Sequence, residues 1–539
     1  MFKRNLNIGR IGLGIFFFII GFGTRAQHTG LLRMPASDMF FYPEGRIYTS
    51  FKPLEVERAD TLKWHRYADS LYLPASKKAI DYILNRDFLK ISGKDYRLEI
   101  LPVIYWEAGR ATDTSAFLFA NTRGIEIKGE LGKQFAFSTA VYENQARFPA
   151  YLDTLFGLHG PANGFPATVP AFGIAKNKKK GVLDFPSVRG YVAYRPSKFF
   201  MFQLGHDAFF IGEGYRSLLL DNRVPPYGYA QITANVWHVR YVVMWALLQD
   251  LRFKGRKFYY RKYLALHYLD WAVSPKFNLG LFESVIWDPG ECRGFDLNFL
   301  NPVIFFKTAE FQSGTKGGNT LLGLQLSYRP FHQLMFYGQF LLDEMTVSKF
   351  FKQPGYWGNK FGLQAGAKAY YVLKGHRFGG LLEWNRIRPY TYSHHPSITD
   401  YSHDYYPLAH PWGANLQEWI ADFTWHYKRF GAHIQFVSGL QGVDYPDSPY
   451  SYGGDIFRDY EERVSSLDVR ILQGNRFLRQ YGTGEVAYTL NPRWNARIFL
   501  GVTAIRHHIE QPAGYYANRR LTWMYAGLRA NMPYYSRDW

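Results

Sequence analysis

The sequence predicts an all-β fold, a single large antiparallel transmembrane β-barrel of about 18 strands with a short N-terminal helical periplasmic segment. Three observations predict it. Segments of about ten residues alternate apolar and polar side chains, as tilted membrane-spanning strands do. Short turns alternate with long connections along the chain. Aromatic residues make up 19% of the chain although its mean hydropathy is slightly negative. A secreted soluble β-rich protein with an aromatic surface remains an alternative on composition.

The chain begins with a three-part export signal. Lys3, Arg4 and Arg10 supply positive charge, residues 11–22 are apolar apart from glycines, and small residues lead to a cleavage point after Ala26. The apolar run is too short to cross a bilayer, which requires roughly 20 residues. We therefore expect residues 1–26 to be a cleaved signal peptide and the mature protein to reach the cell outer membrane.

Residues 27–93 do not alternate as strands do. After Pro74, the apolar residues Ala79, Ile80, Ile83 and Leu84 share one helical face. A short helix is predicted there, at the periplasmic mouth, where it could plug the barrel. The barrel itself is assigned to residues 94–539. The single cysteine, Cys292, cannot form an internal disulfide bond.

The segment from Glu418 to Tyr427 shows the strand pattern most clearly. Its aromatic face carries Trp419, Ala421, Phe423, Trp425 and Tyr427, and its polar face carries Glu418, Asp422, Thr424 and His426. One face suits lipid and the other suits water. The same pattern recurs over residues 320–328, 363–371 and 493–503, and a last strand is predicted near residues 521–530.

The connections test the barrel independently. Turn-forming residues occur at 132–133, 196–197, 329–332, 374–377, 428–431 and 491–492. Between these lie long segments near 144–186, 207–228, 287–319, 344–360, 389–415 and 441–481. Because outer-membrane barrels place short turns in the periplasm and long loops outside, the long segments are expected at the cell surface. The aromatic residue Trp539 is expected to serve as a barrel-assembly signal.

Three long segments hold distinctive motifs. One is rich in glycine and runs from Leu204 to Leu220; another combines Phe299-Leu300-Asn301-Pro302-Val303 with Glu310 and the run 319–323; the third runs from Arg388 to Asn415. At these motifs, between about residues 190 and 440, the chain resembles the gliding motility protein RemB family, which is similar to the outer-membrane capsule assembly protein Wzi. The resemblance implies a many-stranded outer-membrane barrel acting at the cell surface, in movement over surfaces for RemB relatives or in holding capsular polysaccharide for Wzi relatives.

Sugar binding would explain both the aromatic and the basic side chains of the loops, because aromatic faces stack on sugar rings while basic groups donate hydrogen bonds to hydroxyls. An aromatic rim at the membrane surface is the structural alternative. The predicted glycan-binding residues are Arg216, Arg386, Arg388, Tyr390, Tyr392, His394, His403 and Trp412. The residues expected to shape the loops are Gly205, Asp207, Gly212, Glu213, Gly214, Asn301 and Pro302, with Glu213 and Arg216 forming a loop-fixing pair.

No catalytic residues, metal or cofactor are predicted. His206, Asp207 and Ser217 have the side chains of a nucleophilic triad, but they share one Gly-rich loop without a Gly-x-Ser-x-Gly elbow. The cluster His394, His395, Asp400, His403, Asp404 and His410 has no spacing of a closed zinc site.

The charge indicates anionic partners. The formal net charge is +20, and removal of the four basic residues before Ala26 lowers it to +16. A basic run at residues 176–180 lies in a long loop. Outer-membrane lipids and lipopolysaccharide are the expected partners, with anionic surface polysaccharide and motility or secretion proteins as further ones, and no nucleic acid. The preferred hypothesis is a non-enzymatic barrel in gliding motility or polysaccharide attachment; the alternatives are a general diffusion porin and a barrel hydrolase.

Overall fold

The computed structural model describes residues 30–32, 50–52, 54–56, 70–157, 166–178, 181–254, 259–290, 297–306, 318–532 and 537–539. The signal peptide predicted over residues 1–26 lies outside these ranges, as do Cys292 and Glu310. Within them, no helix is long and apolar enough to cross a membrane.

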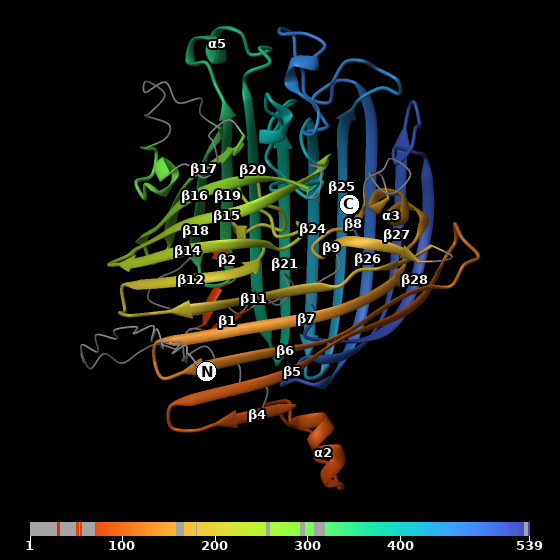
Figure 1. Cartoon of the computed structure of the whole chain (residues 1–539). Coiled ribbons are helices and arrows are strands. Elements are labelled where there is room, and N and C mark those ends of the chain that lie inside the picture. The colour runs from red at the N-terminus through yellow and green to blue at the C-terminus, as the bar shows by residue number, and fades with distance from the viewer. Residues whose placement is uncertain are drawn as a thin grey trace, which may run out of the picture.

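Within the described residues, eighteen antiparallel strands close into a barrel, which confirms the predicted all-β barrel and its strand number. Figure 1 shows the closed ring of strands. Closure is made by the last strand, β28, pairing with the first, β5, with Trp523 opposite Ala111 and Ala530 opposite Ile104. A closed ring leaves no strand edge with unpaired backbone groups, which is what a sheet requires in lipid.

Sixteen of the eighteen barrel strands have ten or more residues, enough to cross a membrane at a tilt, and β11 and β12 have eight each. They are β5 (Tyr96–Ala111), β6 (Leu118–Leu131), β7 (Phe135–Arg147), β11 (Ser187–Tyr194), β12 (Phe200–Asp207), β14 (Tyr227–Val236), β15 (Val239–Lys254), β16 (Tyr259–Ser274), β17 (Phe277–Trp287), β18 (Asn319–Phe331), β19 (Leu334–Glu344), β20 (Lys360–Leu373), β21 (His376–Ile387), β24 (Leu416–Tyr427), β25 (Phe430–Val443), β26 (Asn475–Asn491), β27 (Ala496–Ile509) and β28 (Arg519–Ala530).

Smaller elements lie in the connections and in the N-terminal segment. The short strands are β1 (Gly30–Leu32), β2 (Phe51–Lys52), β3 (Leu54–Val56), β4 (Leu89–Ser92), β8 (Ala167–Val169), β9 (Gly173–Lys178), β10 (Val182–Asp184), β13 (Phe210–Ile211), β22 (Ser402–His403) and β23 (Tyr406–Pro407). The helices are α2 (Lys78–Asn85), α3 (Ala150–Phe156) and α5 (Val347–Lys352), with 3₁₀ turns at η3 (Leu297–Leu300), η5 (Ser397–Thr399) and η6 (Tyr460–Glu462).

The alternation read from the sequence matches the two faces of the wall. In β24, Trp419 and Phe423 point outward and are exposed, whereas Glu418 and Thr424 point into the lumen and are buried. Strands β18 and β20 alternate as predicted. In β27 the predicted start at residue 493 is wrong, because residues 492–495 form the turn and the strand begins at Ala496.

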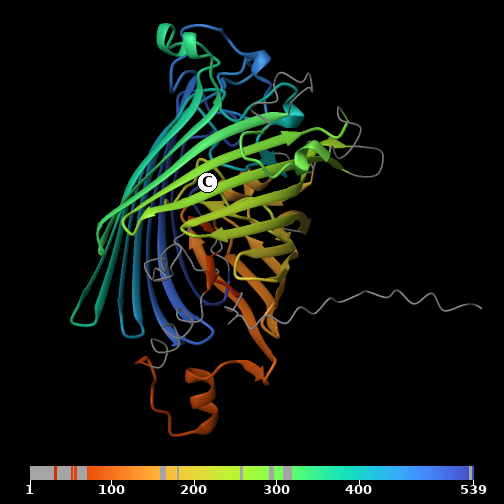
Figure 2. The ribbon, with the colours of Figure 1, turned by 90° about the vertical axis from the view of Figure 1, so that its left-hand side faces the viewer.

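All six predicted short turns are found at one end of the barrel, and two more, at 237–238 and 275–276, join β14 to β15 and β16 to β17. The short α2 lies beyond this end, opposite α5 on the long-loop side (Figures 1 and 2). Arg429, in the β24–β25 turn, donates from Nε to the Leu71 carbonyl (2.8 Å) and from Nη2 to Asn85 Oδ1 (2.8 Å). The helix predicted after Pro74 therefore sits beside the mouth, and the lumen is filled by other segments.

Candidate functional site

Four segments lie inside the barrel, and we call them together the plug: residues 50–52, 208–226, 388–415 and 537–539. Figure 1 shows the C-terminal end of the chain inside the barrel, between β8 and β25, and the view in Figure 2 agrees. Two of the long segments singled out in the sequence, the Gly-rich one and the one that runs from Arg388 to Asn415, lie in the lumen together with residues 50–52 and 537–539.

The wall holds the backbone of the first plug loop through inward-pointing side chains. Glu383 of β21 accepts hydrogen bonds from the backbone N–H groups of Tyr215 (2.7 Å) and Arg216 (3.1 Å). Gln339 of β19 accepts one from the backbone N–H of Leu218 (2.7 Å). Buried backbone groups without partners are costly, so these wall residues fix the path of the loop.

Two glycines of this loop are required by the same contacts. A Cβ on Gly214 would lie 2.2 Å from Glu383 Oε2, and Gly212 has a positive φ of 141° with Gln339 Nε2 only 2.5 Å from where a Cβ would stand. The loop-shaping role predicted for these two glycines fits this geometry. Gly205, predicted in the same loop, instead lies within strand β12.

Arg216 is the centre of the plug and is 1% exposed. Its Nε lies 3.2 Å from Glu418 Oε1 on the wall, and its Nη2 lies 2.8 Å from Asp538 Oδ2. The Trp412 ring centroid lies 5.4 Å from its guanidinium carbon, and His410 Nε2 is 2.6 Å from the same Glu418 oxygen. The carboxylates outweigh the cost of burial and raise the pKa of Arg216. It therefore joins three separate parts of the chain by charge-assisted contacts.

The second plug loop lies on the first. The hydroxyl groups of Tyr392 and Tyr401 donate to the carbonyls of Leu218 (2.9 Å) and Leu219 (2.7 Å). The backbone N–H of His410 donates to the carbonyl of Ser217 (3.0 Å). The tyrosines of the third sequence motif are therefore used inside the protein, where their hydroxyls satisfy loop carbonyls.

Glu213 has partners other than the one predicted. Its Oε2 lies 3.4 Å from Lys368 Nζ and 3.9 Å from Lys52 Nζ, not beside Arg216. Burial raises the pKa of Glu213 and, because an ammonium group is also charged, lowers the pKa of Lys52. The predicted Glu213–Arg216 pair is wrong, since the two side chains leave the loop toward different walls. Ser50 adds a further anchor, donating its backbone N–H to Asp270 Oδ2 (2.8 Å).

Residues 537–539 pass through the lumen and contact the wall. Arg537 Nη2 lies 2.5 Å from Glu107 Oε2, and the Arg537 carbonyl accepts from the Tyr151 hydroxyl (2.8 Å). The Trp539 carbonyl accepts from the Tyr515 hydroxyl (2.9 Å). Trp539, predicted from its aromatic side chain to serve as a barrel-assembly signal, is buried in the plug; its role in assembly stays a prediction.

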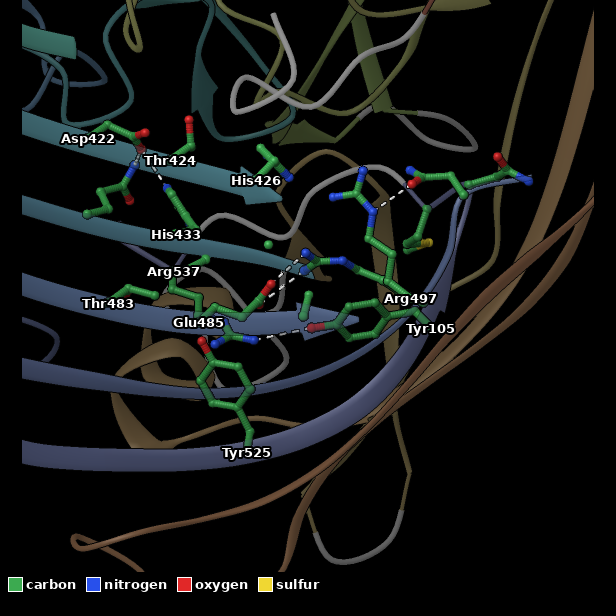
Figure 3. Close-up of a pocket in the computed structure, with 18 of the residues that line it drawn as sticks. Tyr105, Asp422, Thr424, His426, His433, Thr483, Glu485, Arg497, Tyr525 and Arg537 are labelled. Atoms are coloured by element: carbon green, nitrogen blue, oxygen red, sulfur yellow. Dashed lines mark hydrogen bonds and ion pairs between the residues drawn. The ribbon is translucent and has the colours of Figure 1, made fainter. Parts of the chain in front are cut away.

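A polar cavity of about 1070 Å³, counting its open mouth, lies between the plug and the short turns (Figure 3). Its walls come from β5 and β24–β28, and its inner end from Tyr215 and Arg537. An ion pair and a histidine–carboxylate contact line it: Arg529 Nη2 lies 2.5 Å from Glu485 Oε1, and His433 Nε2 lies 2.7 Å from Asp422 Oδ2. The lining residues are Tyr105, Tyr215, Asp422, Thr424, His426, Gly431, Ala432, His433, Gln435, Thr483, Glu485, Ala487, Asn495, Arg497, Tyr525, Arg529, Asn531, Met532 and Arg537.

The predicted glycan-binding residues are not gathered into one open site. Five of them are buried in the plug: Arg216, Tyr390, Tyr392, His403 and Trp412. Arg386 is exposed on the outer face of β21, and Arg388 is half-buried with its Nε donating to the Asn359 carbonyl (2.7 Å). His394 is also half-buried; its Nδ1 lies 2.7 Å from Thr399 Oγ1, and burial lowers its pKa to about 3.

The remaining predicted loop residues lie on different parts of the barrel. Asp207 is buried at the end of β12, 3.0 Å from Arg189 Nη1. Asn301 accepts from the Val303 backbone N–H (3.0 Å), and the carbonyl of Pro302, an exposed residue, accepts from the Tyr241 hydroxyl.

The nucleophilic triad does not assemble. His206 is exposed on the outer face of β12, whereas Asp207 faces the lumen and Ser217 donates to the Ile211 carbonyl (2.5 Å). The histidine cluster also separates, since His395 pairs with Asp459 and His410 with Glu418. In the described ranges, no three His, Cys, Asp or Glu side chains lie together as a metal site requires.

The cavity was not predicted as a site. The strand pattern had placed Asp422, Thr424 and His426 on the wet face of β24, but alternation does not show which wet positions of six strands surround one space. Glu418 was placed on the same polar face, but for the same reason its contact with the plug, and that of Glu383, could not be predicted.

Comparison with known proteins gives fold likenesses only. No protein-family model and no curated protein sequence matches the chain. Among solved structures, it is similar to Wzi of Escherichia coli, described as an outer-membrane carbohydrate-binding β-barrel involved in group 1 capsule assembly, with 12% identity, a TM-score of 0.49, and coverage of 89% of this chain and 93% of that one.

Two porin structures are also similar. OprD of Pseudomonas aeruginosa has 10% identity, a TM-score of 0.40, and coverage of 82% and 96%; a BenF-like porin of Pseudomonas fluorescens has 10%, 0.41, and 81% and 99%. The Wzi likeness agrees with part of the resemblance drawn from the sequence, and none of these comparisons supports RemB. At such low identities the closed barrel rests on its own strand pairing.

Proposed function

We propose that the protein is a closed, non-enzymatic barrel of the bacterial outer membrane that works at the cell surface by holding an anionic polysaccharide. The observation that carries this proposal is the plug. Four segments lie in the lumen, and the central cation, Arg216, is 1% exposed and bound to the wall and to residues 537–539. A lumen filled in this way favours surface attachment over free diffusion of solutes.

Aromatic and basic side chains gather at the long-loop end of the barrel. Half-buried Tyr356 and Tyr460 lie beside buried Trp357, with Lys349 Nζ 3.9 Å from the Tyr356 ring centroid and Arg463 Cζ 4.5 Å from that of Trp357. Aromatic faces and guanidinium groups are the usual partners of sugar rings and carboxylates. We call these five residues the crown. The overall excess of positive charge supports an acidic ligand.

Calorimetry with purified acidic surface polysaccharide tests the proposal. Binding is expected at low ionic strength, weaker in 0.5 M salt, and at least several-fold weaker after Arg463→Ala, while Arg123→Ala on the outer face of β6 serves as the control. Absence of binding at low ionic strength would remove the polysaccharide from the proposal. A deletion strain scored for both capsule retention and spreading on agar separates polysaccharide attachment from gliding motility.

A selective channel is the second candidate, favoured by the polar cavity beneath the plug. In planar bilayers a plugged barrel shows no steady conductance, whereas a porin conducts in the nanosiemens range. Steady large conductance of the wild-type protein would replace the attachment proposal with the channel.

A further inference from the structure

The outer wall carries a pair of arginines that the barrel fold leaves facing each other. Arg506 of β27 and Arg520 of β28 are directly opposite in the strand register, and both side chains are exposed. Directly opposite residues share a face and have Cβ atoms about 4.5–5.5 Å apart, so like charges there are destabilising. Such an arrangement calls for an anion from outside the chain.

The pair lies where the lipid-facing surface ends. Along β27 the outward residues are Ile498, Leu500 and Val502, all well exposed, followed by Ala504 and then Arg506. On β28, Met524 is exposed on the same face below Arg520. Both arginines are near the 510–518 connection, on the long-loop side of the barrel, where lipid headgroups meet the wall.

Two further side chains extend this basic region. His508 follows Arg506 on the same face of β27, and Arg476 of β26 is diagonal to it, because Leu478 is the residue directly opposite His508. We call Arg476, Arg506, His508 and Arg520 the rim patch. In the ranges that the structure describes, its three arginines have no ion pair or side-chain hydrogen bond, and the acid next to it along the chain is exposed Glu510.

Another outward pair on the same barrel shows the ordinary arrangement. Arg123 of β6 and Glu143 of β7 are also directly opposite and exposed, but they carry opposite charges and lie 3.4 Å apart. On this part of the outer wall, the positive charge of Arg123 is therefore balanced by the negative charge of Glu143 on the next strand. In the Arg506–Arg520 pair both directly opposite residues carry the same sign, and the acidic residue beside the patch, Glu510, lies on the far side of His508, nearest Arg476.

We propose that the rim patch binds the phosphate groups of a phosphorylated glycolipid in the outer leaflet. Guanidinium groups bind phosphate oxygens through paired hydrogen bonds, and two of them on adjacent strands can bind one phosphate or two neighbouring ones. The acyl chains would lie along Val502 and Met524 beneath the patch. This proposal depends on the long loops facing outward and not on polysaccharide binding.

Native mass spectrometry of the purified full chain in detergent tests it, with bis-phosphorylated lipid A as the probe and dephosphorylated lipid A and phosphatidylethanolamine as comparison lipids. The variant is Arg506→Gln with Arg520→Gln, and the matched control is Arg123→Gln. We expect wild-type protein and the control to retain bis-phosphorylated lipid A, the double variant to bind it at least tenfold more weakly, and dephosphorylated lipid A to bind weakly to all three.

Equal retention by the double variant and wild type would overturn the proposal, as would equal binding of phosphorylated and dephosphorylated lipid A. Thermal unfolding in phosphate-free detergent separates binding from folding, because removal of a like-charge pair should leave the double variant at least as stable as wild type. A lower Tm would give the pair a structural role and refute the proposal. Patch-dependent binding of an acidic polysaccharide without acyl chains, as tight as that of lipid A, would also refute it.

Discussion

Replacement of Arg216 by Met should release the plug while the wall stays folded. The substitution keeps most of the side-chain volume but removes the charge bound to Glu418 and Asp538. Removing one partner of a buried ion pair costs about 3–5 kcal/mol because a charge stays buried without its partner.

The remaining contacts place the effect near the lower end of this range. Glu418 keeps His410 at 2.6 Å and the Asn385 amide at 3.0 Å, and Asp538 keeps the Tyr215 hydroxyl at 3.1 Å. A loss of about 3 kcal/mol corresponds to roughly a hundredfold change in an equilibrium constant. The plug should therefore open about a hundred times more often.

Planar-bilayer recordings measure this as the frequency of channel openings. Arg386→Met is the matched control, because Arg386 is an exposed arginine on the outer face of β21 with no part in the plug. Detergent-resistant, heat-modifiable migration in gels checks that the barrel of each variant is closed. An opening frequency for Arg216→Met within threefold of wild type, in a folded barrel, would refute the assignment of Arg216 as the centre of the plug.

Three other predictions concern the wall, the plug loops and the N-terminal helix. Phe423→Arg, on the lipid face of β24, should lower the free energy of unfolding by about 2–4 kcal/mol, whereas Leu440→Arg, near the loop end of β25, should lower it by about 0–1 kcal/mol. Urea titration in lipid vesicles measures both values, and equal values would contradict the lipid-facing assignment. Burial raises the pKa of Asp404 to about 8 and lowers those of His394 and His403 to about 3. Because the folded-state pKa of Asp404 is raised, the protein loses stability as the pH rises toward 8; because those of the two histidines are lowered, it loses stability as the pH falls below 6.5. Thermal stability should therefore peak near pH 6.5, and Asp404→Asn should remove the decline between pH 6.5 and 8. An unchanged decline in that variant would show that another group titrates. Arg429→Ala removes the side chain that holds residues 71 and 85, so trypsin should cut at Lys77 and Lys78 at least several times faster than in the Lys428→Ala control; equal cleavage rates would show that Arg429 does not anchor the helix.

The wall could be predicted because alternate side chains of each strand face lipid on one side and the polar lumen on the other. Trp419 and Phe423 face outward and Glu418 faces inward, as the alternation required, and no knowledge of the neighbouring strands was needed. The start of β27 was predicted three residues too early because Trp494 continues the apolar pattern into residues 492–495, which form the turn and where Asn495 has a positive φ of 51°. A two-residue period cannot detect where a strand ends.

The plug could be predicted only as a possibility. Its central contacts join Arg216 to Glu418 and to Asp538, which are 202 and 322 residues away in the chain. Proximity in sequence suggested Glu213 as the partner and was misleading, because the first loop has no helical or strand repeat that would place positions 213 and 216 together. The aromatic residues could not be assigned from the sequence, because a tyrosine or tryptophan such as Tyr392 or Trp412 looks the same in the sequence whether it stacks on a sugar or packs in a core.

Ionic strength distinguishes the plug from the rim patch in one further prediction. Raising salt from 0.1 M to 1 M shortens the screening length from about 10 Å to about 3 Å, which weakens attraction between exposed charges. Arg506 and Arg520 are exposed, so retention of lipid A should fall with salt. Arg216 is enclosed by Glu418, Asp538 and Trp412, so the frequency of channel openings should not rise. If 1 M salt opened the barrel as often as Arg216→Met does, the ion pairs of the plug would have to be in contact with water, and the closed lumen would be wrong.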